Sequence, residues 1–280
     1  MLILYKISEI KQKVTELKQA GNTIGFVPTM GALHPGHISL IEISKKETDI
    51  TVCSIFVNPT QFNNKEDLKH YPRTPEADIK LLEAAGCDIL YMPQVDDVYS
   101  KEYNKQFNFG YLDTILEGAL RPGHFNGVGQ VVSILLEGVN PDKAFFGSKD
   151  YQQVMVVKDL AKQLKLPVEI VACPILREPD GLAMSSRNTR LSAEEREIAA
   201  LIPVMMKDAL VVIKHAGIAK AKEFIAEQVS KESQMKLDYY EVCDADTLKP
   251  ITEIKTGQNV VSLIAVFVGN IRLIDNWMII

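Results

Sequence analysis

The sequence predicts an α/β protein in which a Rossmann-like parallel sheet forms the N-terminal domain and a smaller α+β C-terminal domain follows it. In the first two-thirds of the chain, short runs rich in β-branched residues alternate with helical patterns. The run at 50–57 is apolar almost throughout, as is typical of a strand covered on both faces. Beyond residue 190, helical patterns precede neighbouring strands, as in α+β domains. We therefore expect one domain over 1–176 and a second over 177–280.

Helical and strand-like segments alternate through the first domain. Apolar residues recur every three or four positions in the helical segments, whereas apolar residues follow one another in the strand-like ones. Thr74 followed by Pro75 supplies an N-cap and a first helical residue. In chain order the expected elements are helix 7–18, strand 23–27, helix 36–46, strand 50–57, helix 75–86, strand 88–92, helix 127–136, strand 142–146, helix 149–164 and strand 168–175.

The second domain begins with a polar stretch at 176–190 that lacks clear periodicity. Ser192 and Glu195 then form a capping box, which predicts a long helix that continues to about residue 214. A further helix is expected over 219–231. Three strand-like runs follow at 237–243, 260–268 and 271–274.

Composition excludes several classes of protein. The chain has 280 residues and a net charge of −5, which argues against a nucleic-acid binder because neutralising phosphates needs a basic face. The longest apolar runs fall well short of the ~20 residues of a membrane-spanning helix, and the first residues lack the pattern of a signal peptide. The four cysteines are far apart and form no C-x-x-C pair, so we expect buried, reduced thiols. We expect a cytoplasmic protein that binds neither nucleic acid nor membranes.

The stretch at 28–37, PTMGALHPGH, joins a strand to a helix. In parallel sheets small ligands bind outside the carboxyl ends of the strands, and the free N–H groups at a helix start attract anions. His34 and His37 stand at this helix start, and Gly31 and Gly36 allow close backbone approach. One such histidine would be an ordinary structural residue, but the combination favours a nucleotide phosphate site. A zinc pair is a weaker alternative because no further ligands lie nearby in sequence.

Two other strand ends carry polar residues. Asn58 and Gln61 follow the strand at 50–57, and their amides suit a hydroxy acid because each can donate and accept. Lys149 and Asp150 follow the strand at 142–146. Lys149 is a mobile cation for a transferring phosphate, whereas Asp150 would accept from a ribose hydroxyl or cap the helix.

Two loops are less specific. The loop at 180–188 combines two serines with Arg187 and a glycine, so it could close over bound phosphates or be a polar linker between domains. The loop at 117–125 offers Arg121 and His124 but, taken alone, is typical of a surface turn.

Longer motifs carry a resemblance to known families. His34–His37 resembles the HxGH phosphate motif of class I aminoacyl-tRNA synthetases and related nucleotidylyltransferases, and Met184–Arg187 resembles their mobile second motif, without its usual lysines. The strings PTMGALHPGH, FVNPTQF, YPRT, RPGHFNGV, FFGSKDYQQ, DGLAMSSRN and RLIDN together resemble the pantothenate synthetase (pantoate–β-alanine ligase) family. These strings run from residue 28 to residue 276, nearly the whole chain.

The resemblance implies a two-step ligation. ATP and pantoate would give pantoyl adenylate and pyrophosphate, and the amine of β-alanine would then attack the adenylate to give pantothenate and AMP. Residues 1–176 would bind ATP and pantoate, and 177–280 would act as a lid. Mg2+ would arrive with ATP, and the family's usual state implies a homodimer.

The resemblance also implies roles for individual residues. His34, His37 and Lys149 would be catalytic, with His37 as the acid, and Gln61 and Gln153 would hold pantoate. The ATP-binding residues would be Met30, Gly31, Ala32, Leu33, His34, Pro35, Gly36, His37, Gly147, Ser148, Lys149, Asp150, Leu176, Met184, Ser185, Ser186 and Arg187.

Some positions depart from the family pattern. Asp78 is a possible magnesium ligand, but the expected acidic cluster is only partial because Ala77 separates it from Glu76. Ser148 stands where the family often has Glu or Leu, and Gln130 stands where Thr is expected.

Two alternatives to a ligase stay open at this point. A nucleotidylyltransferase would keep AMP on its product, and a non-catalytic module would only bind a nucleotide or tRNA. The amide-bearing residues at a second strand end favour the ligase, and the acidic charge balance disfavours the tRNA-binding module.

Overall fold

The structure is a computed structural model that describes residues 1–62, 65–99 and 105–279. The chain divides into two compact units, Met1–Pro174 and Ile175–Ile280, each of which is described by itself. The boundary therefore lies at residue 174, compared with the expected 176. Among the described residues, no helix combines the length and the apolar character that crossing a bilayer requires.

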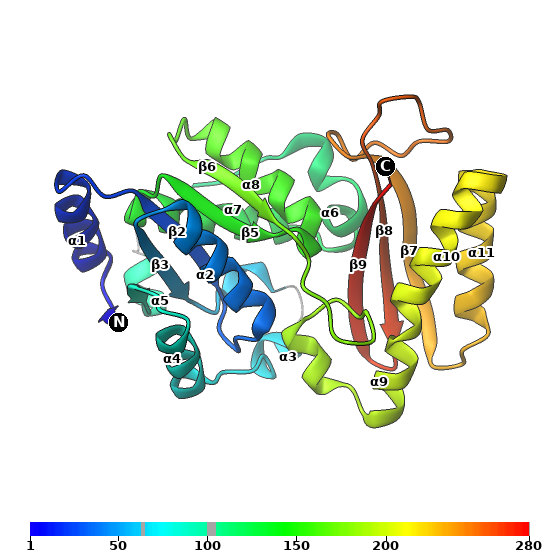
Figure 1. Cartoon of the computed structure of the whole chain (residues 1–280), viewed down its shortest axis with the longest axis horizontal. Helices are drawn as coiled ribbons and strands as arrows, with labels where there is room; N and C mark the ends of the chain where they lie inside the picture. The colour runs from blue at the N-terminus through cyan, green and yellow to red at the C-terminus, as the bar shows by residue number, and fades with distance from the viewer. Residues whose placement is uncertain (63–64, 100–104, 280) are drawn as a thin grey trace. The chain divides into compact units, whose positions relative to one another are not determined.

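Unit 1 is built on a six-stranded parallel sheet with the strand order β1-β4-β3-β2-β5-β6. Figure 1 labels β2, β3, β5 and β6 of this sheet. The strands are β1 (Leu2–Leu4), β2 (Ile24–Thr29), β3 (Ile50–Ile55), β4 (Ile89–Tyr91), β5 (Lys143–Gly147) and β6 (Glu169–Cys173). The Rossmann-like parallel sheet is thus confirmed. β1 pairs in register with β4, and its three residues are too few for a strand pattern to be detected from sequence.

Helices connect the strands and cover both faces of the sheet. They are α1 (Ile7–Gln19), α2 (Pro35–Glu47), α3 (Lys65–Lys69), α4 (Pro75–Ala84), α5 (Val95–Val98), α6 (Leu116–Leu120), α7 (His124–Val139) and α8 (Tyr151–Gln163). Short 3-10 helices follow β3 (η1, Pro59–Gln61), precede α6 (η2, Gly110–Asp113) and follow β5 (η3, Ser148–Asp150).

Alternate residues of the strands pack into two separate hydrophobic cores, one on each face of the sheet. Phe26 and Phe146 pack with α1, α7 and α8 on one face. Val27 and Phe145 pack with α2 and α4 on the other. Successive side chains of a strand point to opposite faces, so a sheet covered on both faces needs the continuous apolar runs seen in the sequence.

The order of the strands reverses between β2 and β5. β2 pairs with β3 on one side and with β5 on the other, and the connections after β2 and β5 run to opposite faces of the sheet. Such a reversal leaves a crevice outside the carboxyl ends of the two strands, which is where open α/β sheets bind ligands.

Unit 2 packs three helices on a three-stranded antiparallel sheet of order β7-β8-β9. Its elements are η4 (Ser186–Arg190), α9 (Ala193–Ala199), α10 (Leu201–Ala216), α11 (Ile218–Ser230), β7 (Met235–Asp244), β8 (Val260–Val268) and β9 (Ile271–Ile279). α10 and α11 lie side by side along this sheet (Figure 1). The α+β architecture is therefore also confirmed.

The last strand of unit 2 extends to Ile279, beyond the expected end at 274, and the long helix expected after the capping box is divided in two. The capping box is present, since the Ser192 hydroxyl accepts from the backbone N–H of Glu195 at 3.2 Å. The helix it starts nevertheless ends at Ala199, and α10 begins at Leu201. Pro203 explains the break, because a proline has no N–H for an α-helical bond and its ring crowds the carbonyl four residues earlier.

Candidate active site

The turn between β2 and α2 is the first part of the site. Gly31 and Ala32 both have left-handed backbone conformations, with φ of 81° and 50°. At Gly31 a Cβ atom would lie 3.0 Å from Ile55 Cγ2 and 3.1 Å from Asp78 Oδ2. This turn therefore requires glycine at position 31, and it delivers His34 as the N-cap of α2.

His37 lies in the first turn of α2 and has a defined tautomer. The backbone N–H of His34 donates to His37 Nδ1 at 3.3 Å, so Nδ1 is the acceptor and the proton of the neutral ring is on Nε2. Burial, and then the nearby His34 and Lys149, together lower the pKa of His37 to about 3. His37 is thus a neutral ring that offers an Nε2–H donor.

His34 packs against His37, with ring centroids 4.0 Å apart. Burial, and then the charge of Lys149, lower the pKa of His34 to about 4. Its Nδ1 atom is buried without a hydrogen-bond partner in the described part of the chain. A buried polar atom of this kind points to a ligand or water that completes the site.

Lys149, at the end of β5, lies near the two histidines. It lies in η3, directly after β5, and its side chain is 18% exposed. Its ammonium is 3.6 Å from the carboxylate of Asp150, and its charge acts on both His34 and His37. The structure therefore brings together the two imidazoles, Lys149 and Asp150 at the strand-order reversal, as the sequence predicted.

Asn58 holds the segment after β3 in place through its side-chain hydrogen bonds. Its side chain is 1% exposed, and its amide nitrogen donates to Gln61 Oε1 and to the Gly127 carbonyl, both at 3.1 Å. Its amide oxygen accepts from the Tyr99 hydroxyl at 2.7 Å. Gln61 Nε2 in turn donates to Met30 Sδ at 3.0 Å. Gln61 is thus held beside the turn that carries the histidines.

α7 packs directly on η1 because Gly127 has no side chain. A Cβ at Gly127 would lie 2.6 Å from the carbonyl oxygen of Thr60. Gln130, further along α7, donates from Nε2 to the carbonyl of Lys105 at 3.0 Å. The residue that departs from the family pattern at position 130 therefore bonds to the backbone of the segment before η2.

His124, to which no role was assigned from the sequence, lies beside Gln61. Its Nδ1 donates to the Gln61 carbonyl at 2.8 Å. Burial, and then the charge of Arg121, lower its pKa to about 4, although the Gln61 carbonyl, Glu117 and Asp150 oppose this shift. His124 is therefore another neutral ring, and it lies near Asp150.

The loop at 117–125 is exposed at its tip but anchored at both ends. Glu117 and His124 are buried, and Gln152 holds the Glu117 end. Its amide accepts from the Glu117 backbone N–H at 3.0 Å and donates to the carbonyls of Leu112 and Ile115. The sequence did not reveal this anchor, because Gln152 lies in α8, far away in sequence.

Gln153 follows Gln152 in the first turn of α8. It is partly buried, and within the described residues its amide forms no hydrogen bond. It is therefore available to a ligand near Lys149, whereas Gln152 is committed to the structure.

A cavity of about 360 Å³ adjoins the turn. Met30, Gly31 and Asp78 line one part of it. Much of the remaining wall is apolar and comes from the end of β3 and from the segments that follow β3 and β4, among them Ile55, Phe56, Val57, Pro59, Met92 and Val95.

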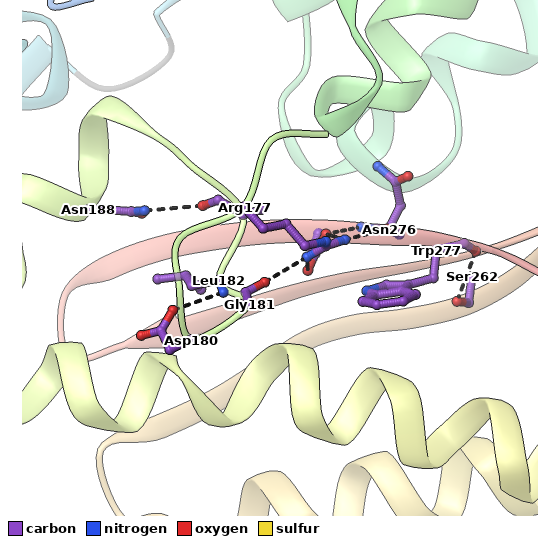
Figure 2. Close-up of polar contacts among 10 residues, drawn as sticks. Arg177, Asp180, Gly181, Leu182, Asn188, Ser262, Asn276 and Trp277 are labelled. Carbon is purple, nitrogen blue, oxygen red and sulfur yellow. Dashed lines mark hydrogen bonds and ion pairs between the residues drawn. The ribbon is translucent and has the colours of Figure 1, made fainter. Parts of the chain in front are cut away.

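Arg177 organises the polar stretch at the start of unit 2. Its guanidinium donates to both carboxylate oxygens of Asp275 in β9, at 2.6 and 3.0 Å, and to the Gly181 carbonyl at 3.0 Å (Figure 2). It also lies 4.4 Å from the centre of the Trp277 ring. The loop that precedes the second motif is thus attached to the sheet of unit 2.

The second motif has a defined shape within unit 2. The Met184 N–H donates to the Leu176 carbonyl at 3.1 Å, and the Ser185 hydroxyl accepts from the Arg187 N–H at 3.2 Å and caps η4. The Asn188 amide donates to the Ala183 carbonyl at 3.1 Å (Figure 2). Leu176 and Met184–Arg187 are therefore neighbours in one folded loop.

Breaking the Arg177–Asp275 pair should destabilise unit 2. Asp275 has only 1% of its side chain exposed, so Arg177→Met leaves a buried carboxylate without its counter-ion, and we expect a loss of about 3 kcal/mol. Trp277 is the single tryptophan and contacts Arg177, so its fluorescence during urea unfolding reports this loss. Lys220→Met, which breaks an exposed pair, is the control and should change nothing measurable; equal stability of both variants would contradict the assignment.

Mild acid should also destabilise the fold through the buried histidines. An unfolded imidazole binds a proton near pH 6.5, but folded His124 does so only near pH 4. Unfolding therefore takes up a proton between these values, and stability present above pH 6.5 is lost as the pH falls. From pH 7 to 5.5 we expect a loss of about 1 kcal/mol for this residue. Urea unfolding of His124→Asn should show a correspondingly smaller loss than wild type; identical pH dependence would refute the prediction.

Comparison with known proteins agrees with this geometry. The family model for pantoate–β-alanine ligase matches residues 2–278. Pantothenate synthetase from Bacteroides fragilis is 46% identical over 277 residues, which cover 99% of this chain and 98% of that protein. The relative from Cytophaga hutchinsonii is 46% identical and covers all of both chains.

Solved structures give the same result. The crystal structure of pantothenate synthetase from Thermus thermophilus matches with a TM-score of 0.92 and 38% identity, covering 99% of each chain. Pantoate–β-alanine ligase from Francisella tularensis, solved in complex with β-γ ATP and β-alanine, matches with a TM-score of 0.81 and 36% identity over 99% of this chain and 97% of that one. The chain belongs to the pantoate–β-alanine ligase family.

Proposed function

We propose that this protein condenses pantoate with β-alanine to pantothenate at the expense of ATP, through a pantoyl adenylate, with release of pyrophosphate and AMP. The observation that carries the proposal is the meeting of two neutral histidines and one lysine at the strand-order reversal of unit 1. Membership of the ligase family and the complex of the F. tularensis relative with β-γ ATP and β-alanine support the same substrates.

The first step makes the carboxyl group of pantoate reactive. A carboxylate is a poor electrophile, and its attack on the α-phosphate of ATP converts it into a mixed anhydride with AMP as leaving group. Negative charge then builds on the bridging oxygen and on the departing pyrophosphate. Donors that are already in place stabilise such charge without reorganising, which is how electrostatic preorganisation accelerates a reaction.

Lys149 and the histidines have complementary parts in this step. Lys149 supplies the full positive charge. His37 supplies its Nε2–H as a neutral donor, a role that we assign to it in place of the acid, because its pKa of about 3 leaves the imidazolium unpopulated near neutral pH. His34 offers the second ring beside it.

Pantoate would lie beside the nucleotide turn. Gln61 and Gln153 carry amides that can donate to its carboxylate and exchange hydrogen bonds with its hydroxyls. Asn58 sets the orientation of Gln61, so the acid is presented in one position. The apolar Met30 side chain contacts the same amide.

The second step is direct attack by the amine of β-alanine on the acyl carbon, and it requires no covalent intermediate on the protein. The cysteines are poor candidates for such an intermediate: burial raises the pKa of Cys87 to about 12 and that of Cys173 to about 11. Thiols with these pKa values hold almost no thiolate near neutral pH.

The remaining ATP-binding assignments rest on the motifs. The turn Met30–His37 and the segment Gly147–Asp150 would bind the nucleotide in unit 1, and Leu176 with Met184–Arg187 would contribute from unit 2. Magnesium enters as part of the substrate, as MgATP. Among the described residues, no group of three or more His, Cys, Asp or Glu side chains is placed to hold a metal, so no step is assigned to a metal held by the protein.

Two properties of the whole protein follow from the family resemblance. We propose a homodimer, which sedimentation at the mass of two chains would test. We also propose a cytoplasmic location, which the four free, buried cysteines support because a reducing compartment keeps thiols unpaired.

Product analysis tests the proposed function. With pantoate and ATP alone, a single turnover should release pyrophosphate while AMP stays in the adenylate; adding β-alanine should release AMP and form pantothenate. A nucleotidylyltransferase would instead keep AMP on its final product whether or not β-alanine is present. Pyrophosphate release at the same rate with and without pantoate would refute the ligase assignment.

A further inference from the structure

Asp78 is a buried carboxylate close to the nucleotide turn. It lies in the first turn of α4 and is 1% exposed. One oxygen accepts from the Ala32 backbone N–H at 3.0 Å, and the other accepts from the Leu33 backbone N–H at 2.8 Å. The Thr74 hydroxyl adds a third donor at 3.0 Å. Both oxygens of Asp78 are thus engaged, and two of the three donors belong to the turn.

The turn that Asp78 holds is not a relaxed one. Ala32 has a left-handed backbone with φ of 50°, and an L-residue in this region is disfavoured by about 1 kcal/mol. Such conformations persist only where the surroundings over-determine them. Asp78 supplies that constraint through consecutive N–H groups, and His34 follows the second of them in sequence.

We propose that Asp78 is the positioning residue of the nucleotide turn, and that it is not a magnesium ligand. Its carboxylate holds the backbone of Ala32 and Leu33, which sets where α2 begins and hence where His34 and His37 present their rings. This inference rests on the proposed function only in taking ATP as the ligand of that turn.

A role for Asp78 as a metal ligand does not fit the contacts. Three of the about four lone-pair sites of this carboxylate already accept hydrogen bonds from Ala32, Leu33 and Thr74, which leaves little of its acceptor capacity for a cation. The neighbouring carboxylate, Glu76, is exposed, and residue 77 is alanine. Asp78, which the sequence suggested as a magnesium ligand, therefore anchors the backbone of the nucleotide turn instead.

Asp78→Asn is the most direct test because it keeps the shape and exchanges one acceptor oxygen for an NH₂ group. That group would face a backbone N–H instead of accepting from it. We expect ATP to bind about tenfold or more weakly, the scale of losing one charge-assisted hydrogen bond. Binding is measured by calorimetry in EDTA, so that no metal takes part. Unchanged ATP affinity in EDTA would overturn the proposal, since a metal ligand would matter only when magnesium is present.

The magnesium dependence of adenylation gives a second, independent readout. With Asp78→Asn the rate should fall while the magnesium concentration for half-maximal rate stays that of wild type. A raised magnesium requirement, or rescue of the rate by excess magnesium, would instead identify a metal ligand. Glu83→Gln makes the same change of charge at an exposed position of α4 and should match wild type in both measurements.

Thr74→Val keeps the test decisive if Asp78→Asn does not fold. It removes the third donor and leaves both backbone bonds, so we expect ATP affinity in EDTA to fall only about threefold. An affinity equal to that of wild type would count against the anchor. Because ATP binding in EDTA needs neither pantoate nor catalysis, a protein that binds ATP but makes no adenylate would refute the proposed function and leave this inference standing.

Discussion

Lys149→Met should slow adenylation by about 10²- to 10³-fold, the scale of losing one preorganised transition-state donor. Methionine keeps much of the length and apolar character of the lysine but removes the ammonium, which is the positive charge that acts on both His34 and His37. The loss should fall mainly on the chemical step, because charge accumulates on the pyrophosphate as it departs.

Rapid-quench measurement of pyrophosphate formation in a single turnover checks this prediction. Lys158→Met is the matched control, since Lys158 lies on α8 and its side chain is exposed; it should react at the wild-type rate. A Lys149→Met protein that forms pyrophosphate as fast as wild type would remove the lysine from the mechanism.

Two substitutions of His37 should show whether it acts as a neutral hydrogen-bond donor or as an acid. His37→Ala removes the Nε2–H and should slow adenylation by about 10²-fold. His37→Gln places an amide N–H near the same point, so it should recover about tenfold of that loss. An amide can replace a neutral donor but cannot act as an acid, and this difference makes the pair informative.

The pH dependence of these variants completes the test. Because the pKa of His37 is lowered to about 3 by burial, its ring stays neutral throughout the range from mildly acidic to basic solution. The adenylation rate of wild type should therefore show no step near pH 6.5 that the His37→Gln variant lacks. A step near pH 6.5 in wild type, together with a His37→Gln variant as slow as His37→Ala, would show that His37 acts as an acid.

Much of the fold could be predicted because its signals are local. A strand covered on both faces needs a continuous apolar run, and β3 has one. A proline after an N-cap threonine begins a helix, and α4 begins at Pro75. Where a signal was short or interrupted, prediction failed: β1 was missed, and the break before Pro203 was not expected.

The first part of the site was predictable for a topological reason. The carboxyl ends of neighbouring parallel strands meet at one edge, so polar residues that follow β2, β3 and β5 had to come close together. Packing around them was not predictable. Asp78 reaches partners 45 and 46 residues away, and Gln152 anchors one end of a loop that looks like a surface turn.

Isotope transfer tests the central claim most directly. With pantoate labelled by 18O in its carboxyl group, attack on the α-phosphate and later release of the adenylate should leave a single 18O atom in AMP, which mass spectrometry detects. Formation of pantothenate with all of the label outside AMP would contradict activation of the acid as an adenylate at the site of His34, His37 and Lys149.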